Sequence, residues 1–287
     1  MPVWEKLKQD RLAMCCLVFL SSVVLVGIFA PFFRTKRPSC CGHLTEVCRA
    51  VLPVPLGNDQ LGRCVLSRLI YAIRPSVLYV LFALLITVMI GAVLGMISGY
   101  HKGRVDNVIM RLCDVMLSFP GEVITLAIIG VFGVGLQNIL LASILTKWAW
   151  FTRVIRTSVM QFTEQNYVRF AKAAGCSPFH VLTRHILPMT FSEIAVIFSS
   201  SVCSMILQIS GFSFLGLGIQ APAPEWGMML NEAKDVMLSY PALMLPPGIA
   251  VMLVSASFGF LGDSLRDAMD PKHEPAAAKR REGRAPS

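Results

Sequence analysis

The sequence predicts an all-α integral membrane protein with about six transmembrane helices. Of its 287 residues, 55% are apolar and 15% are charged, whereas about a quarter of the residues in a soluble domain are charged. The mean hydropathy is +0.64, and several uncharged runs reach the roughly 20 residues that a helix needs to cross a bilayer. The net charge of +9 is explained more simply by basic cytoplasmic loops than by nucleic-acid binding.

The first predicted span covers residues 12–33. It follows a short basic segment and contains no charged residue. It is also longer than the apolar core of a signal peptide, which has about 7–15 residues. We therefore expect residues 1–33 to form a cytoplasmic N-terminal segment and a retained first helix.

Residues 34–75 form the predicted extracytoplasmic loop, which ends in a turn and an amphipathic helix at the membrane surface. The loop contains a histidine and four cysteines, so a metal site or a disulfide is one interpretation and isolated thiols are the other. Their spacing matches no established zinc pattern, and the metal ligands stay unknown. The cysteines are Cys40, Cys41, Cys48 and Cys64.

Residues 76–271 are predicted to form a five-helix core, followed by a disordered basic cytoplasmic tail at 272–287. Small residues four apart, Gly91 and Gly95, allow close helix contact, either within this chain or at a dimer face. Residues 101–111 read as a short cytoplasmic loop. The spans expected in the core cover residues 77–100, 115–134, 139–151 (extended to 155), 194–215 and 244–261.

Two polar residues in the predicted spans are candidates for lining a translocation pathway. A charge at membrane depth is costly and points to a pathway or a buried partner, which makes Glu122 a candidate. The alternative is that the span starts later and Glu122 lies near the headgroups. The amide of Gln208 needs several hydrogen-bond partners if it is buried, whereas the serines around it more simply bond between helices.

The longest patterned polar segment is residues 167–188. Its first half has apolar residues with the i, i+3, i+4, i+7 spacing of one helix face. Gly175 then ends this helix, because glycine tolerates the left-handed conformation common just past a helix end. The apolar residues are Tyr167, Phe170, Ala171 and Ala174.

A second helix is expected directly after Gly175. Ser177 can cap its free N–H groups, and Pro178 suits its first position, where no N–H is needed. Pro188 is expected to end this helix. A plain helix hairpin and a DNA-binding helix-turn-helix are alternatives, but the flanking spans disfavour a DNA reader.

This segment resembles the EAA loop of ABC-transporter permeases, which usually reads E-A-A, three residues, Gly, and ends near His-x-Leu-Pro. Arg169 replaces the usual Glu, and Phe170 replaces the first Ala. The resemblance implies a coupling helix that seats in a groove of the ATPase subunit. The matching residues are Ala171, Gly175, His185, Leu187 and Pro188. The resemblance extends the implied coupling role to Tyr167, Phe170, Ala174, Ser177 and Pro178.

Four further segments are similar to signatures of the C-type permeases of dipeptide, oligopeptide and nickel ABC importers. One segment is L-G-N-D-Q-L-G-R-C-V-L-S-R, in which Cys64 replaces the usual Asp. The G-R-V-D of residues 103–106 also matches. The segment from Gly211 to Gly227 matches most specifically, and its Trp226 suits a membrane interface. Residues 262–271 match the ending that is characteristic of this family.

The resemblance implies a type I ABC importer permease in the bacterial inner membrane, with six spans and both termini cytoplasmic. Its implied partners are a second homologous permease, two ATP-binding subunits, an extracytoplasmic substrate-binding protein and membrane lipid, with no nucleic acid. The chain contains no G-x-x-x-x-G-K-[ST] phosphate loop. We therefore expect no enzyme activity of its own and no cofactor, and the spans are expected to work by alternating access driven by the separate ATPases.

The substrate is predicted less directly. Residues 148–151, Trp-Ala-Trp-Phe, followed by Arg153 and Arg156 resemble nickel-type permeases more than peptide permeases, which favours nickel or a nickel chelate. Di- or oligopeptides are the alternative within the same family. A channel or a membrane-embedded enzyme is a remote alternative, because few ionisable residues lie within the spans.

Overall fold

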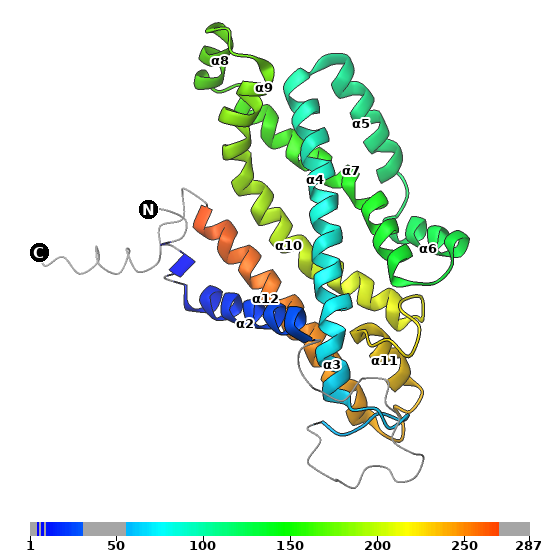
Figure 1. The fold of residues 1–287 in the computed structure, drawn as a ribbon. Coiled ribbons are helices and arrows are strands. Elements are labelled where there is room, and N and C mark those ends of the chain that lie inside the picture. The colour runs from blue at the N-terminus through cyan, green and yellow to red at the C-terminus, as the bar shows by residue number, and fades with distance from the viewer. Residues whose placement is uncertain (1–4, 6, 9, 31–55, 270–287) are drawn as a thin grey trace, which may run out of the picture.

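The computed structural model describes residues 5, 7, 8, 10–30 and 56–269. Figure 1 shows an elongated helical bundle, with α8 and α9 at one end and α3 and α11 at the other. Outside the helices, the described residues contain one isolated bridge, between Asn58 and Cys64. The all-helical fold predicted from the sequence is confirmed. In chain order the elements are α2 (Arg11–Phe29), α3 (Val65–Ile73), η2 (Arg74–Leu78), α4 (Tyr79–His101), α5 (Gly103–Leu117), α6 (Gly121–Phe132), α7 (Leu136–Thr163), α8 (Asn166–Ala173), α9 (Pro178–Val181), η3 (Leu182–Ile186), α10 (Leu187–Phe214), α11 (Trp226–Lys234), η4 (Pro241–Met244) and α12 (Leu245–Met269).

Helices α3, η2 and α4 form one continuous helix of 37 residues. At about 1.5 Å per residue this helix is roughly 55 Å long, well beyond the roughly 30 Å of a bilayer's hydrocarbon core. The helix is therefore longer than a span across the bilayer requires. The π-helical turn η2 contains Pro75, and the N–H of Tyr79 bonds to the carbonyl of Arg74. This wider turn keeps the helix continuous past a proline that cannot donate a hydrogen bond.

A second continuous helix of 37 residues runs from Pro178 through η3 to the end of α10. The prediction that Pro188 ends the helix is wrong. The N–H of Leu187 bonds to the carbonyl of Leu182 in a π-type turn, so the ladder widens just before the proline. The second half of the predicted coupling segment and the following span therefore form one continuous helix.

The predicted third span, residues 115–134, is not one straight helix. Helices α5 and α6 are bent by 77° at a break that contains Pro120, whose backbone is extended (ψ 126°). The predicted loop at residues 101–111 is also wrong, because α4 ends at His101 and α5 begins at Gly103. Arg104 and Arg111 lie on the amphipathic helix α5. Basic residues between two apolar runs suggest a loop, but here they belong to a helix.

Helix α7 packs along α4, and the glycines of α4 make this possible. A Cβ atom at Gly91 would lie 2.5 Å from the Cβ of Phe151, and one at Gly95 would lie 2.9 Å from the carbonyl oxygen of Thr152. Such distances are too short for real Cβ contacts. The structure thus assigns the two glycines to helix packing within the chain, which was the first of the two interpretations.

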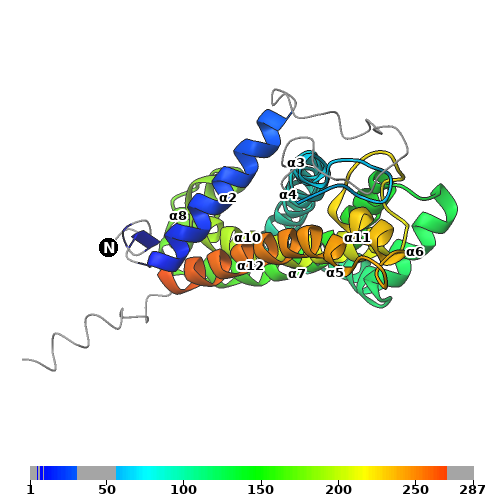
Figure 2. The same ribbon diagram turned by 90° about the horizontal axis from the view of Figure 1, so that it is seen from below.

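Helix α2 lies against α12 (Figure 2) and is fixed at both ends. At its start, Asp10 caps the helix and accepts a hydrogen bond from the hydroxyl of Ser264 (2.7 Å). At its end, the guanidinium of Arg74 donates to the carbonyls of Gly27 and Ile28, both at 2.9 Å. A basic side chain at these last carbonyls satisfies groups that the helix itself leaves unpaired.

By length and composition, the described residues contain four helices that could cross a membrane, or up to five if α5 and α6 together form one broken span. The predicted count of about six also included α7, which has 28 residues but carries Lys147, Arg153 and Arg156. The cytoplasmic placement of both termini stays a prediction. Cys40, Cys41, Cys48 and the predicted disordered tail lie outside the described residues.

Candidate functional site

The predicted coupling segment is a hairpin of α8 and α9 at one end of the bundle (Figure 1). Gly175 adopts φ +78°, the left-handed conformation expected for it. The N–H of Cys176 bonds to the carbonyl of Ala171, and the N–H of Gly175 to that of Lys172, both at 3.1 Å. These two bonds form the Schellman motif that ends α8.

The start of the second helix also follows the prediction. The side chain of Ser177 accepts a hydrogen bond from the N–H of His180 (3.3 Å), and Pro178 occupies the first helical turn. The hairpin is therefore set by local chemistry: a glycine reversal followed by a hydroxyl cap and a proline.

The aromatic side chains of the hairpin point outward. Phe170 and Phe179 are each 77% exposed, and Tyr167 is 42% exposed. The face predicted for the first helix is divided in the structure, because Ala171 is buried whereas Ala174 is exposed. The inward-facing residues that fix the hairpin to the bundle are Val168, Ala171, Val181 and Ile186.

The histidine of the motif lies between the two helices. The ring centroid of His185 is 6.5 Å from that of Tyr167 and 5.8 Å from that of His180. This side chain therefore connects α8 with the continuous helix that contains α10. Arg169, which replaces the usual Glu, is exposed, and so is Pro188.

Two contacts connect the hairpin and the end of α7 with the end of α4. The ammonium of Lys172 lies 4.4 Å from the ring centroid of Tyr100, within the range of a cation–π interaction. Lys102 forms an ion pair with Glu164 (3.1 Å), and both side chains are about half exposed.

The two pathway candidates lie on different elements and are not brought together by any contact that we observe. Glu122 is exposed in the first turn of α6, directly after the bend. Gln208 of α10 is half-buried, and its side-chain oxygen is enclosed without a hydrogen-bond partner. Their assignment to a pathway stays a prediction.

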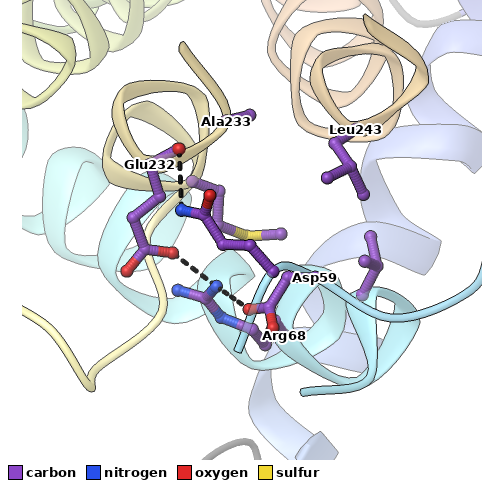
Figure 3. A pocket seen from close by; sticks show the side chains of 8 residues that line it. Asp59, Arg68, Glu232, Ala233 and Leu243 are labelled. Carbon is purple, nitrogen blue, oxygen red and sulfur yellow. Dashed lines mark hydrogen bonds and ion pairs between the residues drawn. The ribbon is translucent and has the colours of Figure 1, made fainter. Parts of the chain in front are cut away.

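Four charged residues form a largely buried cluster at the α3–α11 end of the molecule. Figure 3 shows three of them, Asp59, Arg68 and Glu232. Arg63 pairs with Asp59 (2.6 Å) and Glu232 (2.8 Å), and Arg68 bridges the same two carboxylates at 2.6 and 2.5 Å. The two arginines are 2% and 1% exposed. A cavity of about 20 Å³ beside Arg68 is large enough for one water molecule. Asp59, Arg63 and Arg68 belong to the L-G-N-D-Q-L-G-R-C-V-L-S-R signature described from the sequence. Glu232 was missed, because a lone glutamate on a short helix matches no motif.

The start of α11 is anchored to the long α3–α4 helix. Glu225 is fully buried and accepts hydrogen bonds from the N–H groups of Gly227 (3.0 Å) and Met228 (2.9 Å) and from the hydroxyl of Ser76 (3.2 Å). Desolvation raises the pKa of the Glu225 carboxyl, and these hydrogen bonds oppose the rise.

The prediction that Trp226 lies at a membrane interface is wrong. Its side chain is only 2% exposed, and the indole N–H donates to the carbonyl of Leu69 at 3.1 Å. Trp226 is a core residue that joins α11 to α3. Within the part of the chain that the structure describes, no three His, Cys, Asp or Glu side chains are grouped to hold a metal ion.

Comparison with known protein families identifies the family to which the chain belongs. Residues 91–274 match the family described as binding-protein-dependent transport system inner membrane component. The chain belongs to this family of ABC-importer permeases. Residues 2–39 also match the N-terminal transmembrane domain of oligopeptide transport permease C. The protein is thus a multi-pass inner-membrane permease and the transport component of its system, not itself an ATPase, as the sequence predicted.

Three curated relatives of this permease match between 76% and 95% of its length. The metal-staphylopine import system permease protein CntC of Staphylococcus aureus is 52% identical over 95% of this chain and 94% of its own. The glutathione transport system permease protein GsiD of Pectobacterium atrosepticum is 40% identical, over 76% and 72% of the two chains. The dipeptide transport system permease protein DppC of Alkalihalophilus pseudofirmus is 34% identical, over 94% and 88%.

Proposed function

We propose that this permease imports a transition-metal chelate, with nickel as the first metal to test. The observation that carries the proposal is the 52% identity to a metal-staphylopine permease over 95% of the chain. Identity to the glutathione and dipeptide permeases is lower, at 40% and 34%. The Trp-Ala-Trp-Phe segment at residues 148–151 supports the same direction.

A chelate also suits a permease whose described residues contain no group of three His, Cys, Asp or Glu side chains that could hold a metal ion. A chelated metal keeps the nitrogen and oxygen donors of its carrier, so the transport pathway does not need to replace them. Recognition would depend on the polar and charged surface of the chelate. Glu122 and Gln208 are the residues that we assign to that pathway. Polar groups at membrane depth are costly to bury, so they point to a pathway or to a buried partner.

The permease would act in a complex with a second homologous permease, two ATP-binding subunits and an extracytoplasmic binding protein. ATP binding would draw the ATPases together and move the α8–α9 hairpins with them. The spans would then open outward, and hydrolysis would reset the inward-facing state. The residues assigned to ATPase coupling are Tyr167, Phe170, Ala171, Ala174, Gly175, Ser177, Pro178, His185 and Pro188.

The test is uptake of radioactive nickel by cells with the gene, without it, and with the gene restored. Each strain receives the metal alone, with histidine, and with a carboxylate chelator, and a parallel set contains labelled chelator with unlabelled metal. We expect gene-dependent uptake of metal and chelator together at a fixed ratio. Metal uptake without chelator would instead indicate transport of the free ion.

The alternative cargo is a di- or oligopeptide, because dipeptide and glutathione permeases are also relatives. Unchanged metal uptake in the deletion strain would reject the chelate proposal. Growth of the same strains on dipeptides as the nitrogen source then tests the peptide alternative.

A further inference from the structure

We propose that Asp106 and Arg156 are positioning residues that carry movement of the α8–α9 hairpin into the α4–α5 corner, defined as residues 98–106. The inference rests on the proposed function, because it assumes that ATPase subunits act on the hairpin. Neither residue was a site candidate in the sequence. What distinguishes them is a joint between three helices, in which the carboxylate of Asp106 on α5 bonds to side chains of α4 and α7.

The carboxylate of Asp106 is shared between α4 and α7. The Nε and Nη2 of Arg156 donate to its two oxygens at 2.5 and 2.6 Å, and the hydroxyl of Ser98 donates to Oδ1 at 2.5 Å. Asp106 is 8% exposed, and Ser98 is fully buried. A bidentate arginine–carboxylate pair fixes both distance and angle, so α5 cannot rotate on α7 without breaking it.

The backbone is shaped to bring these three side chains together. A Cβ atom at Gly99 would lie 2.9 Å from the carbonyl oxygen of Arg156, so α4 meets α7 at this residue. Lys102 and Gly103 both have positive φ angles, +48° and +68°. They reverse the chain within one turn and return the start of α5 to the same level.

Two weaker contacts also reach this corner, one from Lys172 of the hairpin and one from Glu164 at the end of α7. The Lys102–Glu164 pair is about half exposed, and exposed ion pairs are screened by solvent and contribute little. The Lys172–Tyr100 contact is a single cation–π interaction. The Asp106–Arg156 pair is bidentate and less exposed, with 11% and 23% of the two side chains accessible, so it is the rigid member of the set. Arg156 is on α7, which leads directly into the hairpin.

The far end of α5 allows a response to such a movement. Helix α5 ends at the break where the chain bends by 77° into α6. A rotation or tilt of α5 can change the angle between α5 and α6 at that break. The first turn of α6 beyond the break contains Glu122. The joint thus connects the hairpin to the segment that carries a pathway candidate.

The chain also provides a matched control for this joint. Arg153 and Asp114 pair between the same two helices, α7 and α5, but their side chains are 45% and 55% exposed. An Asp-to-Asn change at either position removes one negative charge from α5 and leaves the side-chain shape nearly unchanged. Only the change at Asp106 removes a largely buried contact among three helices.

The experiment compares wild type, Asp106→Asn and Asp114→Asn in the purified importer complex reconstituted into liposomes. Hydrogen exchange of α5 and α8 is measured with and without ATP plus vanadate, and ATP hydrolysis is measured beside it. In wild type and Asp114→Asn, we expect trapping to change exchange in both helices. In Asp106→Asn, we expect the change in α8 to remain and the change in α5 to disappear. Chelate uptake per ATP hydrolysed is expected to fall about tenfold, within the range found for changes along coupled networks.

The proposal is overturned if α5 of Asp106→Asn still responds to trapping as in wild type. It is also overturned if both variants lose the response equally, or if neither α5 nor α8 responds in wild type. The melting temperature of each complex identifies general unfolding, which would alter α8 as well as α5. Hydrogen exchange and ATP hydrolysis need no cargo, so failure of the wild-type complex to take up a chelate rejects the proposed substrate and leaves the joint to be judged separately.

Discussion

At the scale of single residues, Gly175 gives the sharpest prediction. A Cβ atom at this position would meet no atom within 4 Å, yet the backbone has φ +78°. A substitution is therefore limited by conformation and not by space. Valine, which is β-branched, should cost about 1–2 kcal/mol in this region, whereas asparagine tolerates it.

We expect Gly175→Val to insert in the membrane and assemble but to lower uptake per ATP hydrolysed, because the turn between α8 and α9 changes shape. Gly175→Asn is the matched control and should remain close to wild type. Both quantities are measured in reconstituted complexes. Normal coupling in Gly175→Val would mean that the conformation of this turn is not needed.

The predictions of local backbone structure were confirmed where a residue acts on its near neighbours in the chain. Gly175, Ser177 and Pro178 act within a few residues of themselves, so their roles could be predicted from the sequence. Trp226 could not be placed in this way, because an indole suits both a membrane interface and a core with one acceptor. Its acceptor is the carbonyl of Leu69, which is distant in sequence and adjacent only in the folded chain.

At the scale of elements, the buried charge cluster holds α11 to the segment that precedes α3. Arg68 bonds to both Asp59 and Glu232 and is only 1% exposed. Replacing it with methionine leaves two carboxylates with one guanidinium. Breaking a buried pair typically costs about 3–5 kcal/mol, so we expect Arg68→Met to lower the free energy of unfolding by roughly 3 kcal/mol.

The control for this prediction is Lys102→Met at the half-exposed pair with Glu164, which should cost less than about 1 kcal/mol. Thermal unfolding of the two purified variants, followed in the same detergent, measures the difference. Equal melting temperatures for Arg68→Met and wild type would show that the cluster does not stabilise this end of the molecule.

Helix ends and breaks were predicted less well than helix existence. Pro120 and Pro188 are both exposed prolines, yet the chain bends by 77° around one and continues as one helix through the other. The difference is a π-type turn before Pro188, which supplies a wider hydrogen-bond ring. Whether a proline is absorbed or breaks a helix depends on packing around it, which one sequence does not reveal.

At the scale of the whole molecule, the two ends of the bundle differ in kind. The α3–α11 end buries its charged residues in pairs and its tryptophan in the core. The α8–α9 end exposes two phenylalanines that are each 77% accessible, outside any helix–helix contact that we observe. Exposed aromatic side chains are enriched where proteins bind one another, which fits the coupling role that we propose.

We therefore expect Phe170→Ala with Phe179→Ala to reduce co-purification of the ATP-binding subunits. Aromatic residues commonly dominate interface energies, and loss of a central one costs about 2 kcal/mol or more, so the double variant should weaken assembly by well over tenfold. Phe191→Ala is the matched control, because Phe191 is 64% exposed but lies on α10, outside the α8–α9 hairpin. Assembly is measured by quantitative pull-down at several concentrations of the ATPase subunits. A double variant that binds the ATPases as tightly as the Phe191→Ala control would move the docking surface away from the hairpin, and the coupling route through Arg156 would then need a different starting point.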